Sequence, residues 1–164
     1  NLGALLAKSG QLKSAIQHYH DALLFNPTNS DTRHNLGIAL LRSGKSTEAI
    51  AEFEKVLKSK PDFVPSLQQM TWVLATYPEC QNPERAQLYS KRLMSFPPTP
   101  LAFDAAAAAA AVNGRFDEAI KLANQGIELA RASKQTTVEG NLREHLALFR
   151  SGKIYTTSQQ RVTE

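Results

Sequence analysis

Apolar residues recur along most of this 164-residue chain at the three- and four-residue spacing of an amphipathic helix. Gly, Pro and Asn residues interrupt the pattern at short intervals and divide it into pairs of helices. The last clear apolar stripe consists of Leu142, Leu146 and Phe149, which fall on one face of a helix predicted at 137–150. The pattern therefore predicts an all-α protein built of antiparallel helix pairs.

The predicted helix pairs repeat along the sequence with a period of about 34 residues. Five features agree in register, each pairing a residue of the first repeat with one of the second. These are Leu2-Gly3 with Leu36-Gly37, Gly10 with Gly44, Ala15 with Ala49, Tyr19 with Phe53, and Pro27 with Pro61. Such agreement predicts a tandem array in which each helix pair packs on the next.

Each small residue of the repeat has a physical role that the sequence predicts. Gly3 and Gly37 stand inside helices at a cost of about 1 kcal/mol relative to Ala, so we expect two helices to approach closely there. Gly10 and Gly44 follow the first helix of a pair, where a left-handed cap favours glycine. The run Ala105–Ala111 is a strong helix former with little bulk, and it also predicts close helix approach.

The array is predicted as a single domain at 1–152, followed by a polar tail at 153–164. Asn82 followed by Pro83, and Thr99 followed by Pro100, are predicted helix starts after the irregular third repeat and before the fourth. The predicted segments are repeats at about 1–29, 30–63, 64–98 and 99–133 and a capping helix at 137–150. The chain begins inside a repeat, so we expect it to be a piece of a longer protein.

With these motifs the chain resembles the tetratricopeptide repeat (TPR) family, except that Arg33 replaces the usual Trp. Its later repeats resemble the C-terminal region of bacterial multi-repeat proteins, some of which carry a membrane or glycosyltransferase part upstream. The resemblance implies an α-solenoid, a right-handed superhelix whose first helices line a concave groove. Extended peptides often bind in that groove.

The repeat register then indicates which side chains would line the groove. The candidate partner-binding residues are Lys8, His34, Asn35, Ile38, Arg42, Gln68, Gln69, Trp72 and Thr76. The same register places Asp104, Ala105 and Ala108 in the groove. Asn1, Asn35 and Gln69 occupy one equivalent position, similar to the asparagine ladder of O-linked N-acetylglucosamine transferase repeats, where side-chain amides pair with a peptide backbone. This series ends at Ala105. Trp72 either anchors a partner or packs on a neighbouring repeat, and a lone histidine such as His34 is usually an ordinary surface residue.

The composition of the chain excludes some classes of function and some kinds of site. The net charge is +4, but Lys and Arg alternate with Asp and Glu and form no basic stripe, so nucleic-acid binding is not expected. The single cysteine, Cys80, excludes a disulfide within the chain and a Cys-rich metal site. No run reaches the roughly 20 apolar residues of a membrane helix. The compartment is not indicated.

Enzyme motifs are absent from the sequence: it has no phosphate-binding glycine loop, no nucleophile elbow and no His-Glu-x-x-His. We therefore expect no catalysis, cofactor or metal. The leading interpretation is a protein–protein interaction module that binds a peptide or protein segment in its groove. The alternatives are a structural spacer or self-association appendage of a larger protein and, on the basic pI alone, an RNA-binding repeat.

Overall fold

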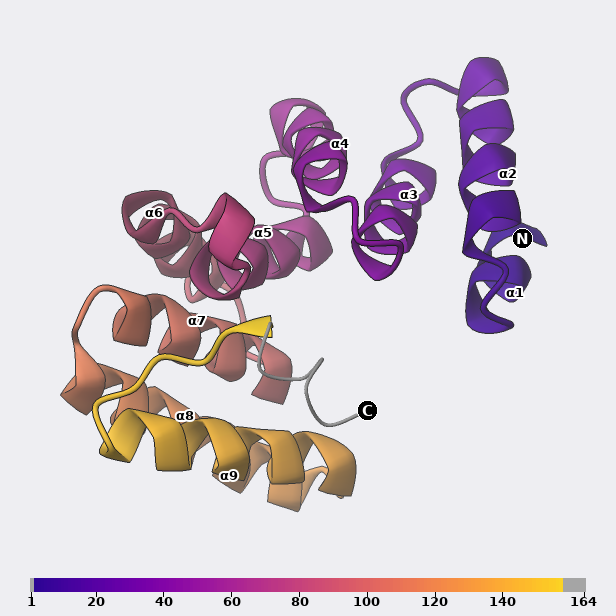
Figure 1. Ribbon diagram of the computed structural model, residues 1–164. Helices are drawn as coiled ribbons and strands as arrows, with labels where there is room; N and C mark the ends of the chain where they lie inside the picture. The colour runs from indigo at the N-terminus through magenta and orange to yellow at the C-terminus, as the bar shows by residue number, and fades with distance from the viewer. Residues whose placement is uncertain (1, 158–164) are drawn as a thin grey trace. The chain divides into compact units, whose positions relative to one another are not determined.

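The computed structural model describes residues 2–157, and over that range it contains helices, turns and no strand (Figure 1). The helices are α1 (Leu2–Lys8), α2 (Leu12–Phe25), α3 (Ser30–Arg42), α4 (Ser46–Ser59), α5 (Val64–Thr76), the short 3-10 helix η1 (Pro78–Cys80), α6 (Pro83–Leu93), α7 (Pro100–Val112), α8 (Phe116–Ala132) and α9 (Thr136–Arg150). The predicted all-α class is confirmed. The chain divides into two compact units, Asn1–Ser66 (unit 1) and Leu67–Glu164 (unit 2).

Unit 1 is a series of helices in which α1 packs on α2, α2 on α3 and α3 on α4. A Cβ added at Gly37 would lie 2.5 Å from Cε1 of Phe53, and one added at Gly3 would lie 2.7 Å from Cε1 of Tyr19. The predicted close approach at these glycines is therefore confirmed, and it is made against the two aromatic residues of the repeat. Gly44 has a φ of 78°, which confirms the predicted left-handed cap.

Arg33 connects α3 to α4 and to the turn before α3. Its Nη1 lies 2.7 Å from Oε2 of the buried Glu52, and its Nη2 donates to the carbonyl oxygen of Pro27 at 2.7 Å. Burial alone would raise the pKa of Glu52, but hydrogen bonds from Lys55 and Arg33 lower it below its usual range. At the position of the family's usual Trp, this chain thus has an ion pair between the two helices.

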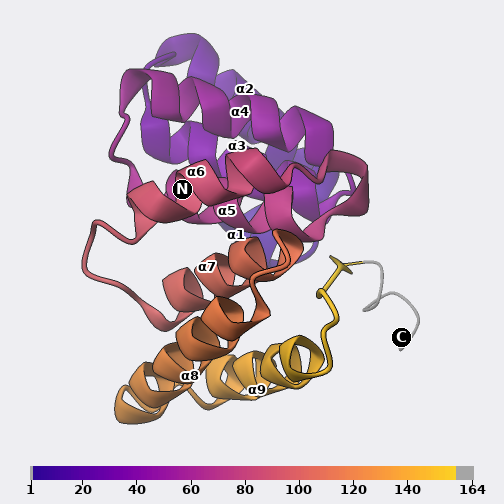
Figure 2. The same ribbon diagram turned by 90° about the vertical axis from the view of Figure 1, so that its left-hand side faces the viewer.

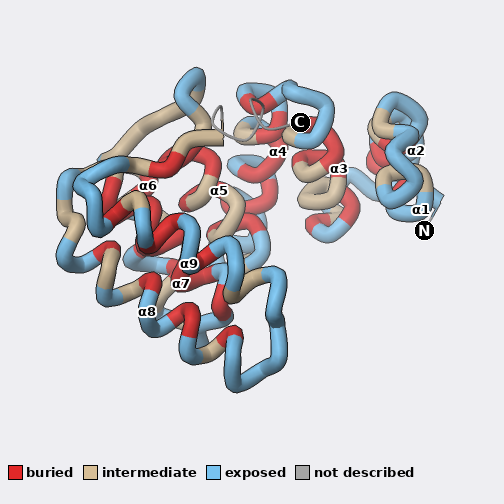
Figure 3. Tube along the Cα trace, turned by 60° about the horizontal axis from the view of Figure 1, so that its bottom comes forward, coloured by how far each residue is buried: buried red, intermediate tan, exposed pale blue. Residues whose placement is uncertain are grey.

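In unit 2, α7 packs on α6, α8 and α9, while α8 also packs on α9 (Figure 2). Every residue of Ala105–Ala111 is buried, and Figure 3 shows the tube of α7 buried along most of its length. Small side chains allow neighbouring helices to surround α7, as its sequence predicts. Asn82 and Thr99 cap α6 and α7 by accepting from the backbone N–H groups of Arg85 and Ala102, which confirms the predicted helix starts.

The segment after α9, residues 153–157, runs back along unit 2. Ile154 packs against the hydrophobic core, and Tyr155 is buried within it. Thr157 Oγ1 donates to the carbonyl oxygen of Thr76 at 3.4 Å. The predicted polar tail at 153–164 therefore begins with a packed stretch, and its remaining residues, 158–164, lie outside the described residues.

Candidate functional site

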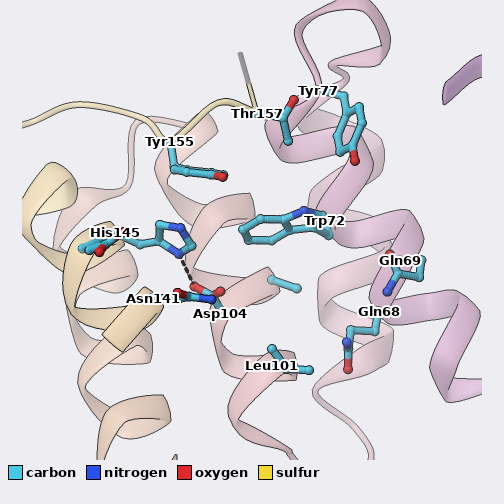
Figure 4. A pocket seen from close by; sticks show the side chains of 12 residues that line it. Gln68, Gln69, Trp72, Tyr77, Leu101, Asp104, Asn141, His145, Tyr155 and Thr157 are labelled. Atoms are coloured by element: carbon cyan, nitrogen blue, oxygen red, sulfur yellow. Dashed lines mark hydrogen bonds and ion pairs between the residues drawn. The ribbon is translucent and has the colours of Figure 1, made fainter. Parts of the chain in front are cut away.

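A pocket opens on unit 2 between α5, α7, α9 and the packed segment that follows α9 (Figure 4). Its cavity volume is about 260 Å³. The residues that line it come from four stretches of the sequence: Gln68, Gln69, Trp72 and Tyr77; Leu101, Asp104 and Ala105; Asn141, Glu144 and His145; and Tyr155 and Thr157.

Three aromatic rings form one wall of the pocket. The ring centroids of His145 and Tyr155 are 4.1 Å apart, those of Trp72 and Tyr155 5.4 Å, and those of Trp72 and His145 5.6 Å. All three pairs are tilted, an arrangement that aromatic side chains favour over a face-to-face sandwich. Trp72 belongs to α5 and is half-buried, so part of its ring remains open to the cavity.

A buried carboxyl group, that of Asp104, is hydrogen-bonded to one of these rings. Nδ1 of His145 is 2.8 Å from Oδ1 of Asp104, and both side chains are less than one-tenth exposed. His145 lies on the same face of α9 as Leu142, Leu146 and Phe149, which directs it toward α7. Because Asp104 accepts this hydrogen bond, α7 can carry a carboxylate among buried alanines without leaving it unpaired.

The pocket has negative charge. Among its described lining residues, Asp104 and Glu144 are carboxylates, and none is Lys or Arg. Burial, followed by the charges of Asp104, Tyr77 and Glu144, raises the pKa of the Tyr155 phenol to about 12. Tyr155 therefore stays a neutral hydroxyl at physiological pH, and it lies within the electrostatic field of both carboxylates.

The structure brings together three of the predicted binding residues in this pocket: Gln68, Gln69 and Trp72. Thr76 is a correction to the predicted set, because it is fully buried and its hydroxyl donates to the carbonyl oxygen of Trp72 at 2.9 Å. A threonine that bonds back onto its own helix in this way offers no side-chain surface to a partner.

The other predicted residues belong to unit 1. Lys8 and Arg42 are exposed, and Arg42 Nη1 donates to the carbonyl oxygen of Ala7 at 2.7 Å; Asn35 and Ile38 are half-buried on α3. His34 is held inside the unit, since its Nδ1 is 3.0 Å from Ser66 Oγ and its ring contacts Phe53 and Phe63. Burial lowers the pKa of His34 to about 4, against a smaller opposing effect of Asp31. His34 is thus a neutral packing residue.

Sequence reasoning missed His145 and Tyr155 as members of the site and placed Asp104 in the groove without selecting it. Two features of the sequence could have indicated these residues. His145 interrupts the apolar stripe of its helix, and Ile154 and Tyr155 are large apolar residues in a stretch otherwise expected to be polar.

The Asp104–His145 pair can hold or pass a proton, and the hydroxyl groups among the described lining residues are those of Tyr77, Tyr155 and Thr157. Within residues 2–157, no group of three or more His, Cys, Asp or Glu side chains is arranged to hold a metal ion. No helix in that same range has the length and apolar character needed to span a membrane.

The fold and the site define a class: an α-helical repeat protein with a pocket between its later helices. Residues 6–71 match the sequence profile described as tetratricopeptide repeat. Over 68 residues, 42% of this chain, the sequence is 34% identical to DnaJ homolog subfamily C member 3 of Gallus gallus. That alignment spans only 14% of the relative's length.

Solved structures show the same fold. A MamA fragment from Desulfovibrio magneticus RS-1 superposes with a TM-score of 0.69 at 15% identity, covering 92% of this chain and 90% of that one. Another MamA crystal structure gives 0.68 at 14% identity, covering 100% and 98%. The P58(IPK) TPR domain gives 0.54 at 17% identity, covering 92% and 56%. Residues 6–71 thus match the tetratricopeptide repeat profile, and the chain as a whole has the helical-repeat fold of these solved structures.

Proposed function

We propose that this chain is a protein-interaction module whose pocket in unit 2 receives a segment of a partner protein. The observation that carries the proposal is the partly open ring of Trp72 at the wall of a cavity rimmed by amide side chains. Tryptophan is enriched among the residues that dominate binding energy at interfaces.

The size and polarity of the pocket support a peptide as the occupant. Its volume of about 260 Å³ is below the range of roughly 300–1,000 Å³ that drug-sized ligands occupy, and it suits one side chain of a longer segment. The amides of Gln68, Gln69 and Asn141 can both donate and accept, so they can pair with the backbone on either side of that side chain.

Unit 1 offers further candidate contacts of the same kind. Asn35 and Ile38 lie on α3, the first helix of its pair, and both are half-buried with some surface left for a partner. An amide next to an aliphatic side chain can bind a peptide segment by a backbone hydrogen bond and an apolar contact.

The proposal is tested by selecting peptides from a displayed random library against the whole chain and measuring their affinities. Trp72 is the single tryptophan, so its emission reports occupancy of this pocket directly. Two leucines of unit 2 give a matched pair of variants. Leu101 is 45% exposed and lines the pocket, whereas Leu88 is 66% exposed on α6 and does not line it.

We expect Leu101→Ala to weaken selected peptides about three- to tenfold, the cost of roughly 1 kcal/mol of apolar contact. Leu88→Ala should leave their affinity unchanged, and bound peptide should shift the emission of Trp72. Peptides that bind equally to both variants without altering the emission would show that interaction occurs elsewhere on the chain, and the pocket would lose its proposed role.

A further inference from the structure

We infer that the side chain received by this pocket is an arginine of the partner. The inference rests on the proposed function and adds to it the chemical class of the ligand. It is carried by the coincidence, in one cavity, of two carboxylates, an aromatic wall and no cationic lining residue among those described.

The charge of the cavity is negative in every state of His145. With a neutral imidazole, Asp104 and Glu144 give two negative charges; with an imidazolium, one negative charge remains. Among the described residues, neither carboxylate forms an ion pair with Lys or Arg. A carboxylate can accept about four hydrogen bonds, and in the described part of the chain Asp104 receives one, from His145. Acceptor capacity for a cationic donor is therefore available.

The aromatic wall fixes how a cation can approach. The ring centroids are only 4.1–5.6 Å apart, so no cation fits between the rings. A cation entering the cavity meets the open part of Trp72 on one side and Asp104 on the other (Figure 4). Glu144 also lines the cavity. Trp is the side chain whose ring attracts a cation most strongly.

Arginine fits this geometry better than lysine. A guanidinium is planar and stacks on an aromatic ring, while its five N–H groups donate in the ring plane. The cavity offers several acceptors for those donors, namely the two carboxylates and the amide oxygens of Gln68, Gln69 and Asn141. An ammonium is a compact, strongly hydrated charge with three donors, so it gains less from stacking and loses more on desolvation.

The test uses small probes on the whole chain and follows the emission of Trp72. N-acetyl-arginine amide is compared with N-acetyl-citrulline amide, its neutral isostere, and with N-acetyl-lysine amide. We expect saturable binding of the arginine probe, at least about tenfold tighter than the citrulline probe. Binding should weaken between about 0.1 M and about 1 M salt, where the screening length falls from about 10 Å to about 3 Å. Equal responses to arginine and citrulline, or to arginine and lysine, would overturn the inference.

Two glutamate variants distinguish binding in the pocket from nonspecific electrostatic attraction of the probe to the chain. Glu144 lines the pocket, and Glu84 is an exposed glutamate in the first turn of α6 outside it. Glu144→Gln should weaken the arginine probe about three- to tenfold, whereas Glu84→Gln should change its affinity by less than about twofold. Asp104→Asn should weaken binding of the arginine probe further. Thermal unfolding checks that this variant is folded. If it is not folded, the Glu144→Gln variant alone decides the test. Equal effects of the two glutamate variants would contradict the proposed site.

Failure of this inference is distinguishable from failure of the proposed function. Suppose that the selected peptides need Leu101 for binding but contain no arginine and bind the Glu144→Gln variant normally. This result would support the interaction module and contradict the arginine site. Suppose instead that the arginine probe needs Glu144 for binding, but that no selected peptide needs Leu101. This result would support the arginine site and contradict the peptide-binding role.

Discussion

At the scale of single residues, His34 makes unit 1 sensitive to acid. The folded-state pKa is about 4, because burial disfavours the imidazolium, and the ordinary value is 6.5. Between these values the unfolded chain binds the proton and the folded chain does not. Stability is therefore fully present above about pH 6.5 and is lost as the pH falls toward 4.

The expected loss from His34 is roughly 2–3 kcal/mol between neutral pH and pH 4, since each pKa unit is worth about 1.4 kcal/mol. Urea unfolding at several pH values measures it. His34→Gln keeps a polar partner for Ser66 without titrating there, so this variant should show a shallower loss of stability with acid. His20→Gln, which removes an exposed histidine of α2, is the control. A pH slope unchanged by His34→Gln would mean that the imidazole is solvated.

Residues whose role is local were predictable from the sequence, and those whose role depends on a distant partner were not. Gly44 follows a helix in a repeated motif, so its left-handed φ of 78° could be expected from neighbouring residues alone. Asp104 and His145 are 41 positions apart, and each reads separately as a polar interruption of an apolar helix. Only the packing of α9 on α7 gives them a common function.

At the scale of helix pairs, the contact of Gly37 with Phe53 sets how closely α3 approaches α4. Gly37→Ala would place a Cβ 2.5 Å from Cε1 of Phe53, whose ring is fully buried. Overpacking costs about 1–3 kcal/mol and the gain in helix propensity offsets about 1 kcal/mol of it, so we expect a net loss of up to roughly 2 kcal/mol in the free energy of unfolding.

Two comparisons isolate the steric cause of that loss. Gly140→Ala on α9 meets no atom within 4 Å, so it should stabilise the chain by about 0.5–1 kcal/mol through propensity alone. In a Phe53→Leu background, Gly37→Ala should cost at least about 1 kcal/mol less than in the native chain, because the smaller side chain leaves space. Urea unfolding of the four-variant cycle measures both. If the effects of the two substitutions on the free energy of unfolding are additive, the loss caused by Gly37→Ala does not come from the contact with Phe53.

The helices themselves were well predicted where local signals were strong. Thr99 with Pro100 marks the start of α7, and the alanine run predicts its continuation, because both act through the backbone of a few adjacent residues. The packed stretch after α9 was not predicted. Tyr155 is ordered by Trp72 and His145, which belong to α5 and α9, and nothing next to it in the sequence indicates that contact.

At the scale of the whole molecule, the repeat family explains only part of the site. The match to the family profile ends at residue 71, whereas the pocket is lined by residues from 68 to 157. Trp72, Asp104, His145 and Tyr155 all lie beyond the matched segment. The pocket is therefore an elaboration of the later repeats and of the segment after α9, which the repeat pattern alone does not specify.

We expect Tyr155 to cover Trp72 at one side of this pocket. Its removal tests how residues 153–157 contribute to stability and to the shielding of Trp72 from water. Tyr155→Ala deletes a buried ring that contacts both Trp72 and His145, so it should lower the free energy of unfolding by roughly 2–4 kcal/mol. It should also admit water to Trp72 and shift the emission of this single tryptophan to longer wavelength. Tyr89→Ala removes a half-buried tyrosine of α6 that does not line the pocket, and it should leave the emission maximum in place. An unchanged emission maximum in Tyr155→Ala would mean that residues 153–157 do not cover Trp72 in solution. The arginine site would then be open on that side, and Trp72, the amides and the carboxylates would remain to bind the guanidinium.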